Sequence, residues 1–262
     1  AIDQAHARGL EFHAYINTHT AWQAGSCTNP AQKPTYSLSH TFWQHFDADN
    51  ASARDWLIHN NSGTPIQCEE SSYTWIAPGV PDASAYTREQ VMYVVENYDV
   101  DGVHFDRIRT PGLEYSHDPI SDARFNGPGN PDGLNFSDWT KDQFTRFLCD
   151  LYAQIMEVKS NVKVSSAPLG LYQGNRYPGY PLSACGFFYG NTCVYQDAQA
   201  WLAAGAQDFI VPQIYWADGG ANPDFSDVLP DWLANNAGRH IYAGQITSLG
   251  VGNLISQIGV TR

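Results

Sequence analysis

The chain has 262 residues, of which 43% are apolar and 13% aromatic, which is enough to bury the core of one large domain. Its formal net charge is −13 with only 14 Lys and Arg residues, and this balance disfavours nucleic acid or an anionic membrane surface as partner, since both are bound through clustered positive charge. A neutral ligand fits this charge balance better. No run of about 18 apolar residues is available to span a membrane.

Five short apolar segments predict strands, because each ends in polar or turn residues. In chain order they span residues 10–17, 100–106, 162–168, 209–216 and 240–246. Helical periodicity lies between them, at residues 82–97, 139–159, 196–204 and 227–236. The pattern is clearest at residues 139–159, where we expect the N-cap at Ser137 or Asp138.

Repeated alternation of strands and helices predicts a parallel sheet, either doubly wound or closed as a barrel. The loops favour the barrel, because they are long after the strands and short after the helices. The first strand is also followed by NTHTAWQAG rather than by the glycine-rich phosphate turn of most doubly wound folds. We therefore predict an α/β fold of the (β/α)8 TIM-barrel class, with residues 1–262 as a single domain.

Five strands are fewer than the eight of a full barrel, and the chain begins and ends in helical sequence. We expect the barrel to be incomplete in this chain, as in a fragment of a longer protein, with the first two strands and the last strand missing. The alternative is that residues 64–75 hold strands that the apolar pattern does not reveal.

The five cysteines also bear on where the protein works. Cys185 and Cys193 bracket a short loop, Cys27 and Cys68 lie in long polar segments, and Cys149 lies in a helical pattern. This arrangement predicts two loop disulfides and one buried thiol, and with them an exported protein, although five reduced, half-buried thiols are the alternative. There is no Cys-x-x-Cys pair and no metal-like spacing of histidines with carboxylates, so we expect no metal and no cofactor.

The stretch DGVHFDRIRTPG, residues 101–112, is an apolar strand that ends in charged residues and a turn. Alternation along a strand predicts one face with Gly102, His104, Asp106 and Ile108, and another with Val103, Phe105 and Arg107. In a barrel the first face points inward, so Asp106 is expected at the carboxyl end of its strand, where barrel enzymes hold catalytic groups. Arg109 is expected to pair with Asp106, either to keep it ionised or simply to pin the loop.

Together with this stretch, four other blocks resemble the bacterial glycoside hydrolase-like family ten. They are AHARGLEFHAYIN, WIAPGVP, VSSAPLG and DFIVPQIYW, in the family's order and across nearly the whole chain. The resemblance implies a secreted or envelope-associated barrel glycosidase with Asp106 as its leading catalytic carboxylate. Family members are linked to the cleavage of glycan strands such as peptidoglycan stripped of its peptides. Many relatives place a second Asp directly after the first, where this chain has Arg107.

Glycoside hydrolysis normally needs a second carboxyl group. The candidates in polar segments are Glu69, Glu70, Glu114, Asp118 and Asp218, and we rank Asp218 and Glu70 ahead of the others. The acid of family-eighteen chitinases, which carry a similar strand, corresponds to Ile108 in this chain, so a mechanism that uses that acid is excluded.

Other polar and aromatic side chains near predicted strand ends are candidates for sugar binding, because they supply hydrogen bonds or flat faces. They are His13, Tyr15, Asn17, His104, Arg109, Gln213, Tyr215 and Trp216.

We therefore expect a glycosidase that cleaves an extracellular or cell-envelope polysaccharide with carboxylate chemistry, located outside the cytoplasm. One alternative is a barrel that binds glycan without cutting it, as a structural surface component. Another is a different barrel enzyme, such as an amidase or a deacetylase.

Overall fold

The structure is a computed structural model that describes residues 1–27, 32–174, 176–177, 185, 189–220 and 223–261, and all statements below concern these residues. Within them, five parallel strands form one sheet in the order β1-β4-β5-β6-β7. The strands are β1 (His13–Asn17), β4 (Gly102–Asp106), β5 (Lys163–Ser166), β6 (Phe209–Ile210) and β7 (His240–Ile241). Each new strand joins the sheet on the same side, so the order never reverses as it does in a doubly wound fold. The sheet winds in one direction like a barrel wall, which confirms the predicted fold class.

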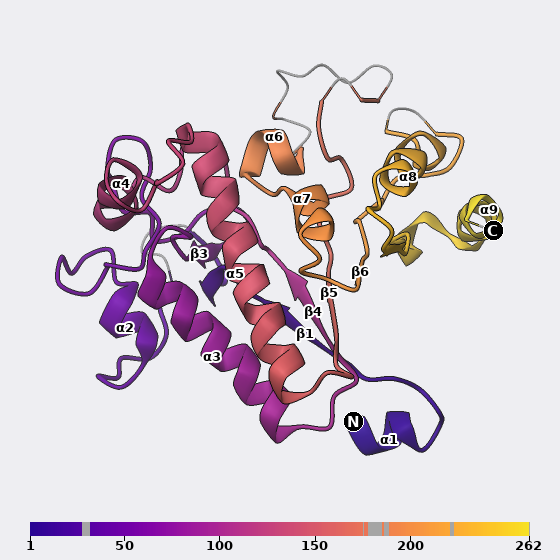
Figure 1. Cartoon of the computed structure of the whole chain (residues 1–262), viewed down its shortest axis with the longest axis horizontal. Coiled ribbons are helices and arrows are strands. Elements are labelled where there is room, and N and C mark those ends of the chain that lie inside the picture. Colours follow the sequence, from indigo (N-terminus) through magenta and orange to yellow (C-terminus); the bar gives the residue numbers. More distant parts are fainter. Residues whose placement is uncertain (28–31, 175, 178–184, 186–188, 221–222, 262) are drawn as a thin grey trace.

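Helices alternate with these strands as predicted. They are α1 (Ile2–His6), α3 (Pro81–Asn97), α5 (Phe136–Val158), α7 (Ala198–Ala203), α8 (Phe225–Ala234) and α9 (Val251–Val260). Figure 1 shows α3 and α5 side by side in front of β1 and β4, with α8 and α9 at the other end of the molecule. The N-cap of α5 is Asn135, whose side chain accepts from the backbone N–H of Asp138 at 3.0 Å, so the predicted caps Ser137 and Asp138 were wrong.

The segments inserted after β1 and β4 contain smaller elements. These are β2 (Thr20–Gln23), α2 (Thr41–His45), β3 (Tyr73–Trp75) and α4 (Pro119–Phe125), while α6 (Gly190–Val194) and the 3-10 helix Thr247–Leu249 follow later. The strands β2 and β3 pair antiparallel in a separate sheet. Residues 64–75 therefore do contain a strand that the apolar pattern missed, but it is not a barrel strand.

The last two barrel strands are much shorter than predicted. Pro212 has no N–H to donate to a ladder, and β6 ends before it, at Ile210. Parallel pairing resumes beyond the proline, where Gln213 forms isolated bridges with Leu169 and Gly244. Gln213 is thus still held in line with the sheet although it lies outside a regular strand.

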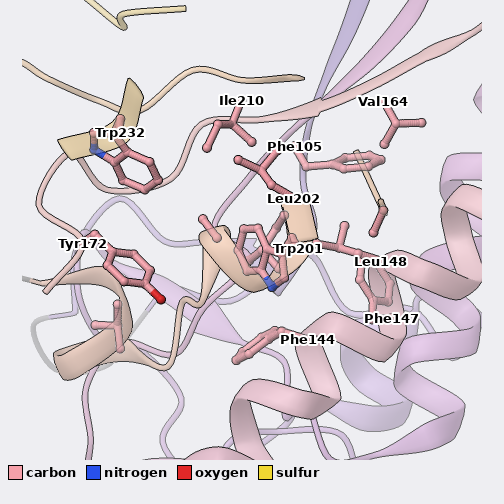
Figure 2. Packing of buried hydrophobic residues seen from close by; sticks show 14 of the residues in the cluster. Phe105, Phe144, Phe147, Leu148, Val164, Tyr172, Trp201, Leu202, Ile210 and Trp232 are labelled. Atoms are coloured by element: carbon pink, nitrogen blue, oxygen red, sulfur yellow. The ribbon is translucent and has the colours of Figure 1, made fainter. Parts of the chain in front are cut away.

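The two faces of β4 have opposite environments, as the alternation predicted. Val103 and Phe105 are fully buried under the helices, and Figure 2 shows Phe105 among side chains of α5 and α7. The labelled neighbours include Phe144, Phe147, Leu148, Trp201 and Leu202. Burial of this face fixes the register of β4 and turns His104 and Asp106 to the other side. Ile108 was expected on the side of Asp106, but it is buried in the helix-facing core, because the strand ends at Asp106.

The cysteine prediction is confirmed in its main point. Cys27 pairs with Cys68 and Cys185 pairs with Cys193, while Cys149 carries a free thiol that is half-buried rather than fully buried. No helix in the described ranges combines the length and hydrophobicity that crossing a bilayer requires.

Candidate active site

Asp106 is the last residue of β4, at the carboxyl end of the parallel sheet. In the neighbouring strand β1, Asn17 lies directly opposite Asp106 and Tyr15 lies opposite His104. Parallel strands are about 4.8 Å apart, so the side chains of these four residues share one small area of the inner face. The register thus brings candidate residues from β1 and β4 together at one end of the sheet.

Hydrogen-bond donors face both carboxylate oxygens of Asp106. The Tyr15 hydroxyl donates to Oδ2 at 2.6 Å, and the backbone N–H of Arg107 donates to Oδ1 at 2.6 Å. Gln213 Nε2 donates to Oδ1 at 3.2 Å and to the carbonyl of Ala167 at 2.8 Å. Donors from three parts of the sheet therefore fix the orientation of this half-buried carboxyl group.

Three ionisable neighbours of Asp106, namely Tyr15, Tyr215 and His104, are neutral near pH 7. Partial desolvation of its hydroxyl and then the hydrogen bond to Asp106 raise the pKa of Tyr15, so the phenol stays a donor. Burial and the charge of Asp106 likewise raise the pKa of Tyr215. Burial lowers the pKa of His104, whose Nδ1 pairs with Ser165 Oγ at 2.8 Å, so its imidazole is neutral near pH 7.

The two arginines after Asp106 pair with Glu70 instead of with Asp106. Arg107 Nη1 lies 2.9 Å and Arg109 Nη2 lies 3.1 Å from Glu70 Oε2. The expected Arg109–Asp106 ion pair was wrong: in the described part of the chain the ion pair of Arg109 is with Glu70, and its Nη1 also donates to the carbonyl of Thr110. Arg109 is buried and its guanidinium lies 5.0 Å from the centre of the Trp75 ring.

Backbone geometry directs the Arg107 side chain toward Glu70. Arg107 has φ of 56°, in the left-handed region that non-glycine residues rarely adopt. This conformation ends the strand, points the N–H of Arg107 at Asp106 and places its guanidinium 4.1 Å from the centre of the Tyr73 ring. The strained residue Arg107 thus links Asp106 to the arginine–glutamate cluster, which consists of Glu70, Arg107 and Arg109.

The Glu70 side of the cluster lies in an unusual turn. Glu70, Ser71 and Ser72 all have positive φ, at 23°, 58° and 65°, and the turn is closed where Glu69 pairs with Tyr73. The disulfide from Cys68 to Cys27 anchors the chain just before this turn. Sequence analysis ranked Glu70 as a candidate but missed its arginine partners, since the residues between sequence positions 70 and 107 carry no signal for the contact.

The other highly ranked carboxyl group, Asp218, lies in a different environment. The hydroxyls of Ser226 on α8 and Ser256 on α9 both donate to its carboxylate. These two donors lower the pKa of Asp218. Figure 1 shows α8 and α9 at the opposite end of the molecule from β3, the strand that closely follows Glu70 in the sequence. Asp218 therefore joins two helices and, among the described residues, makes no hydrogen bond with Asp106.

The remaining predicted residues divide into those near Asp106 and those away from it. His13 lies at the amino end of β1, opposite Gly102, and pairs with Glu11 Oε2 at 3.1 Å. At about 3.3 Å per residue this is roughly 13 Å along the strand from the level of Asp106. Trp216 packs against the helix-facing core. The structure therefore gathers Tyr15, Asn17, His104, Gln213 and Tyr215 near Asp106, and leaves His13 and Trp216 outside this group.

The lower-ranked acid Asp118 is a helix cap. It is buried at the N-terminus of α4, its side chain accepts from the backbone N–H of Ser121 at 2.8 Å, and burial raises its pKa to about 6. No group of three or more His, Cys, Asp or Glu side chains within the described ranges is arranged to hold a metal ion.

Known proteins resemble this chain along most of its length. The family model described as glycosyl hydrolase-like 10 matches residues 1–253. Glycosyl hydrolase YngK of Bacillus subtilis is 25% identical over 249 residues, which cover 93% of this chain and 44% of YngK. Glycosyl hydrolase DigH of Escherichia coli K12 is 25% identical over 237 residues, or 89% of this chain and 49% of DigH. The chain thus spans about half the length of these relatives.

Among solved structures, the glycoside hydrolase domain of PgaB (BpsB) from Bordetella bronchiseptica shares the fold. The TM-score is 0.53 at 14% sequence identity, and the match covers 97% of this chain and 68% of that one.

Proposed function

Because the chain belongs to the glycosyl hydrolase-like 10 family, we propose that it is a glycosidase that cleaves an extracellular or cell-envelope polysaccharide, such as peptide-free peptidoglycan strands. The observation that carries the proposal is the carboxylate of Asp106, held by three donors at the carboxyl end of a barrel strand. This is the place at which barrel enzymes hold their catalytic groups.

The geometry suits Asp106 for an anionic role. Hydrogen-bond donors face both of its oxygens, so the ionised form is the one that satisfies them. A fixed carboxylate stabilises the positive charge that develops on a sugar ring as the glycosidic bond breaks, either as nucleophile or as base for water. Asn17, Tyr215 and neutral His104 lie beside it and supply hydrogen bonds for sugar hydroxyls.

Of the two highly ranked partners for Asp106, Glu70 is connected to it and Asp218 is not. Arg107 joins Glu70 to Asp106, through its guanidinium on one side and its backbone N–H on the other. Since Glu70 is held between two guanidinium groups, we assign it a positioning role that acts on Asp106 through Arg107. Asp218 keeps its two serine donors and a structural role.

Secretion is part of the proposal. Two disulfides support an oxidising location, such as the cell surface, the periplasm or the medium, because disulfides are rare in reducing compartments. The acidic net charge of −13 is consistent with a glycan substrate and disfavours nucleic acid.

The test is release of reducing ends from a panel of glycans that includes peptide-free peptidoglycan strands. We expect the Asp106→Asn variant to lose activity by roughly 10²- to 10⁴-fold, as removal of an acid–base group usually does. Asp82→Asn, an exposed acid in the first turn of α3, is the matched control and should keep full activity.

The alternative function, glycan binding without cleavage, is favoured by one observation: both highly ranked partner acids are already engaged, Glu70 by arginines and Asp218 by serines. The same experiment separates the two functions. If no glycan releases reducing ends while wild type and Asp106→Asn bind glycan equally, the enzyme proposal fails and the binding function replaces it.

A further inference from the structure

A separate hollow lies one strand away from Asp106, beside the edge strand β1. It encloses about 390 Å³, within the size range of small-ligand sites. One wall is the end of β1, at Asn17 and Thr18, and the opposite walls come from residues 39–42 and from Tyr86 and Gln90 on α3. Three segments that are distant in sequence therefore form this cavity.

The lining mixes apolar side chains with polar, uncharged ones. Among described residues, no Asp, Glu, Lys or Arg lines this cavity. Its hydroxyl and amide groups come from Asn17, Thr18, Thr20, Ser39, Thr41, Tyr86, Thr87 and Gln90. Such groups both donate and accept, so they match a neutral ligand that is rich in hydroxyl groups and offer no countercharge to an ion.

Two ring side chains in the lining have defined orientations. His40 Nδ1 accepts the backbone N–H of Phe42 at 3.1 Å, so in the neutral ring the hydrogen is on Nε2, which becomes a donor. The hydroxyl of Tyr86 pairs with Thr41 Oγ1 at 2.9 Å. The nearly fully buried rings of Phe42 and Phe46 also belong to the lining and make part of the wall apolar, as in most small-ligand sites.

A second hollow along β1 shows that these hydroxyl and amide groups are not general to the edge of the sheet. It encloses about 700 Å³ near the amino end of β1 and is lined largely by apolar side chains, including Ile2, Phe12, Val94 and Val100. That composition is typical of a packing surface. The hollow near Asn17 differs from it in chemistry although both lie beside the same strand and helix.

Asn17 connects the uncharged cavity to the candidate active site. It lines the cavity and lies opposite Asp106 in the β1–β4 register, about 4.8 Å away at the usual strand spacing. We propose that the cavity is a glycan subsite that takes a neutral sugar unit adjacent to the bond placed at Asp106. This inference rests on the proposed glycosidase function and adds a requirement for an uncharged unit at that position.

The test uses a substitution that fills the cavity, Gln90→Trp, because Gln90 is exposed on α3 and an indole there occupies the space without disturbing the core. Gln154→Trp, at an exposed position of α5, is the matched control. Binding of neutral N-acetylchitohexaose and of its cationic, fully deacetylated counterpart is measured by calorimetry in the Asp106→Asn background, so that nothing is cleaved. Thermal unfolding followed by circular dichroism verifies that each variant is folded.

We expect Gln90→Trp to bind the neutral hexamer about tenfold more weakly than the control, and the cationic hexamer to bind the two variants equally, because its binding to the acidic surface does not depend on the cavity. Equal binding of the neutral hexamer by Gln90→Trp and Gln154→Trp overturns the subsite, as does an absence of binding to the Asp106→Asn parent. Failure of the two proposals is distinguishable. Binding that depends on Gln90 without any cleavage by the wild type rejects only the glycosidase, and cleavage that ignores Gln90→Trp rejects only the subsite.

Discussion

The candidate site has two halves that the fold builds in different ways. The strand half, Tyr15, Asp106 and Gln213, is held by pairing of parallel strands and by the ladder that continues past Pro212. The loop half, Glu70, Arg107 and Arg109, is held by ion pairs, positive φ values and a disulfide. The sheet thus provides Asp106, the carboxylate that we propose as catalytic, while the loop half holds the residues that surround it.

The largest expected effect concerns the disulfide that anchors the loop half. Replacing Cys27 and Cys68 by serine opens a loop with a sequence separation of 41, and the chain-entropy model gives a loss of about 4 kcal/mol in the free energy of unfolding. The matched control removes Cys185–Cys193, with a separation of 8, where the same model gives about 2.5 kcal/mol. Urea unfolding of both double variants measures the difference. Equal losses would mean that the Cys27–Cys68 bridge does not constrain the loop half more than a local bridge does.

The next effect tests the strand half. In Tyr15→Phe, Asp106 loses the hydroxyl that donates to its Oδ2 at 2.6 Å. We expect kcat/KM to fall about 10²-fold, as it does in other enzymes that lose one charge-stabilising hydrogen-bond donor. The removed hydrogen bond favours ionised Asp106, so the acidic limb of the pH profile should move to higher pH. Since the pKa of Tyr15 is itself raised, the loss should persist into mildly alkaline solution.

Tyr93→Phe is the control for that experiment, because Tyr93 is an exposed tyrosine on α3 and is not among the hydrogen-bond donors to Asp106 in the described residues. A pH profile of Tyr15→Phe that keeps its acidic limb in place, with only KM altered, would show that Tyr15 contacts sugar and does not tune Asp106.

A smaller effect is expected from the loop half. Glu70→Gln leaves Arg107 and buried Arg109 without their common carboxylate, so we expect about 2 kcal/mol of lost stability and a decrease of about tenfold in kcat. Glu89→Gln, at an exposed position of α3, serves as control. If Glu70→Gln instead abolishes activity as completely as Asp106→Asn, with stability unchanged, Glu70 is a catalytic carboxyl group and the separation of the two halves is wrong.

The same division explains what the sequence could predict. Period-two alternation placed Val103 and Phe105 under the helices and Asp106 on the inner face, because one buried face fixes the register of a strand. The alternation could not predict that the strand ends at Asp106, since the positive φ of Arg107 depends on tertiary contacts with Glu70 and Tyr73. Ile108 was misplaced for that reason, and the partner of Arg109 was misassigned because nothing near Glu70 in sequence indicates that its turn reaches the end of β4.

The short strands β6 and β7 show a second limit. The apolar run at residues 209–216 predicted one continuous strand, but Pro212 interrupts the ladder after Ile210. The prediction for Gln213 was still useful, since isolated bridges on both sides keep it aligned with the sheet and close to Asp106. Side-chain periodicity therefore survived a break in the backbone pairing.

The smallest effect is expected at Asp218, which lies in neither half. A general acid must hold a proton near its working pH, whereas the donors Ser226 and Ser256 lower the pKa of Asp218. Asp218→Asn should therefore change kcat/KM by less than about twofold, with exposed Asp227→Asn as control. A lowered pKa stabilises the fold above the pKa of the unfolded chain, so the variant should be slightly less stable than wild type at neutral pH and equally stable once acid protonates the carboxyl in both states. A large loss of activity at unchanged stability would make Asp218 the second carboxyl group and move the site toward α8 and α9.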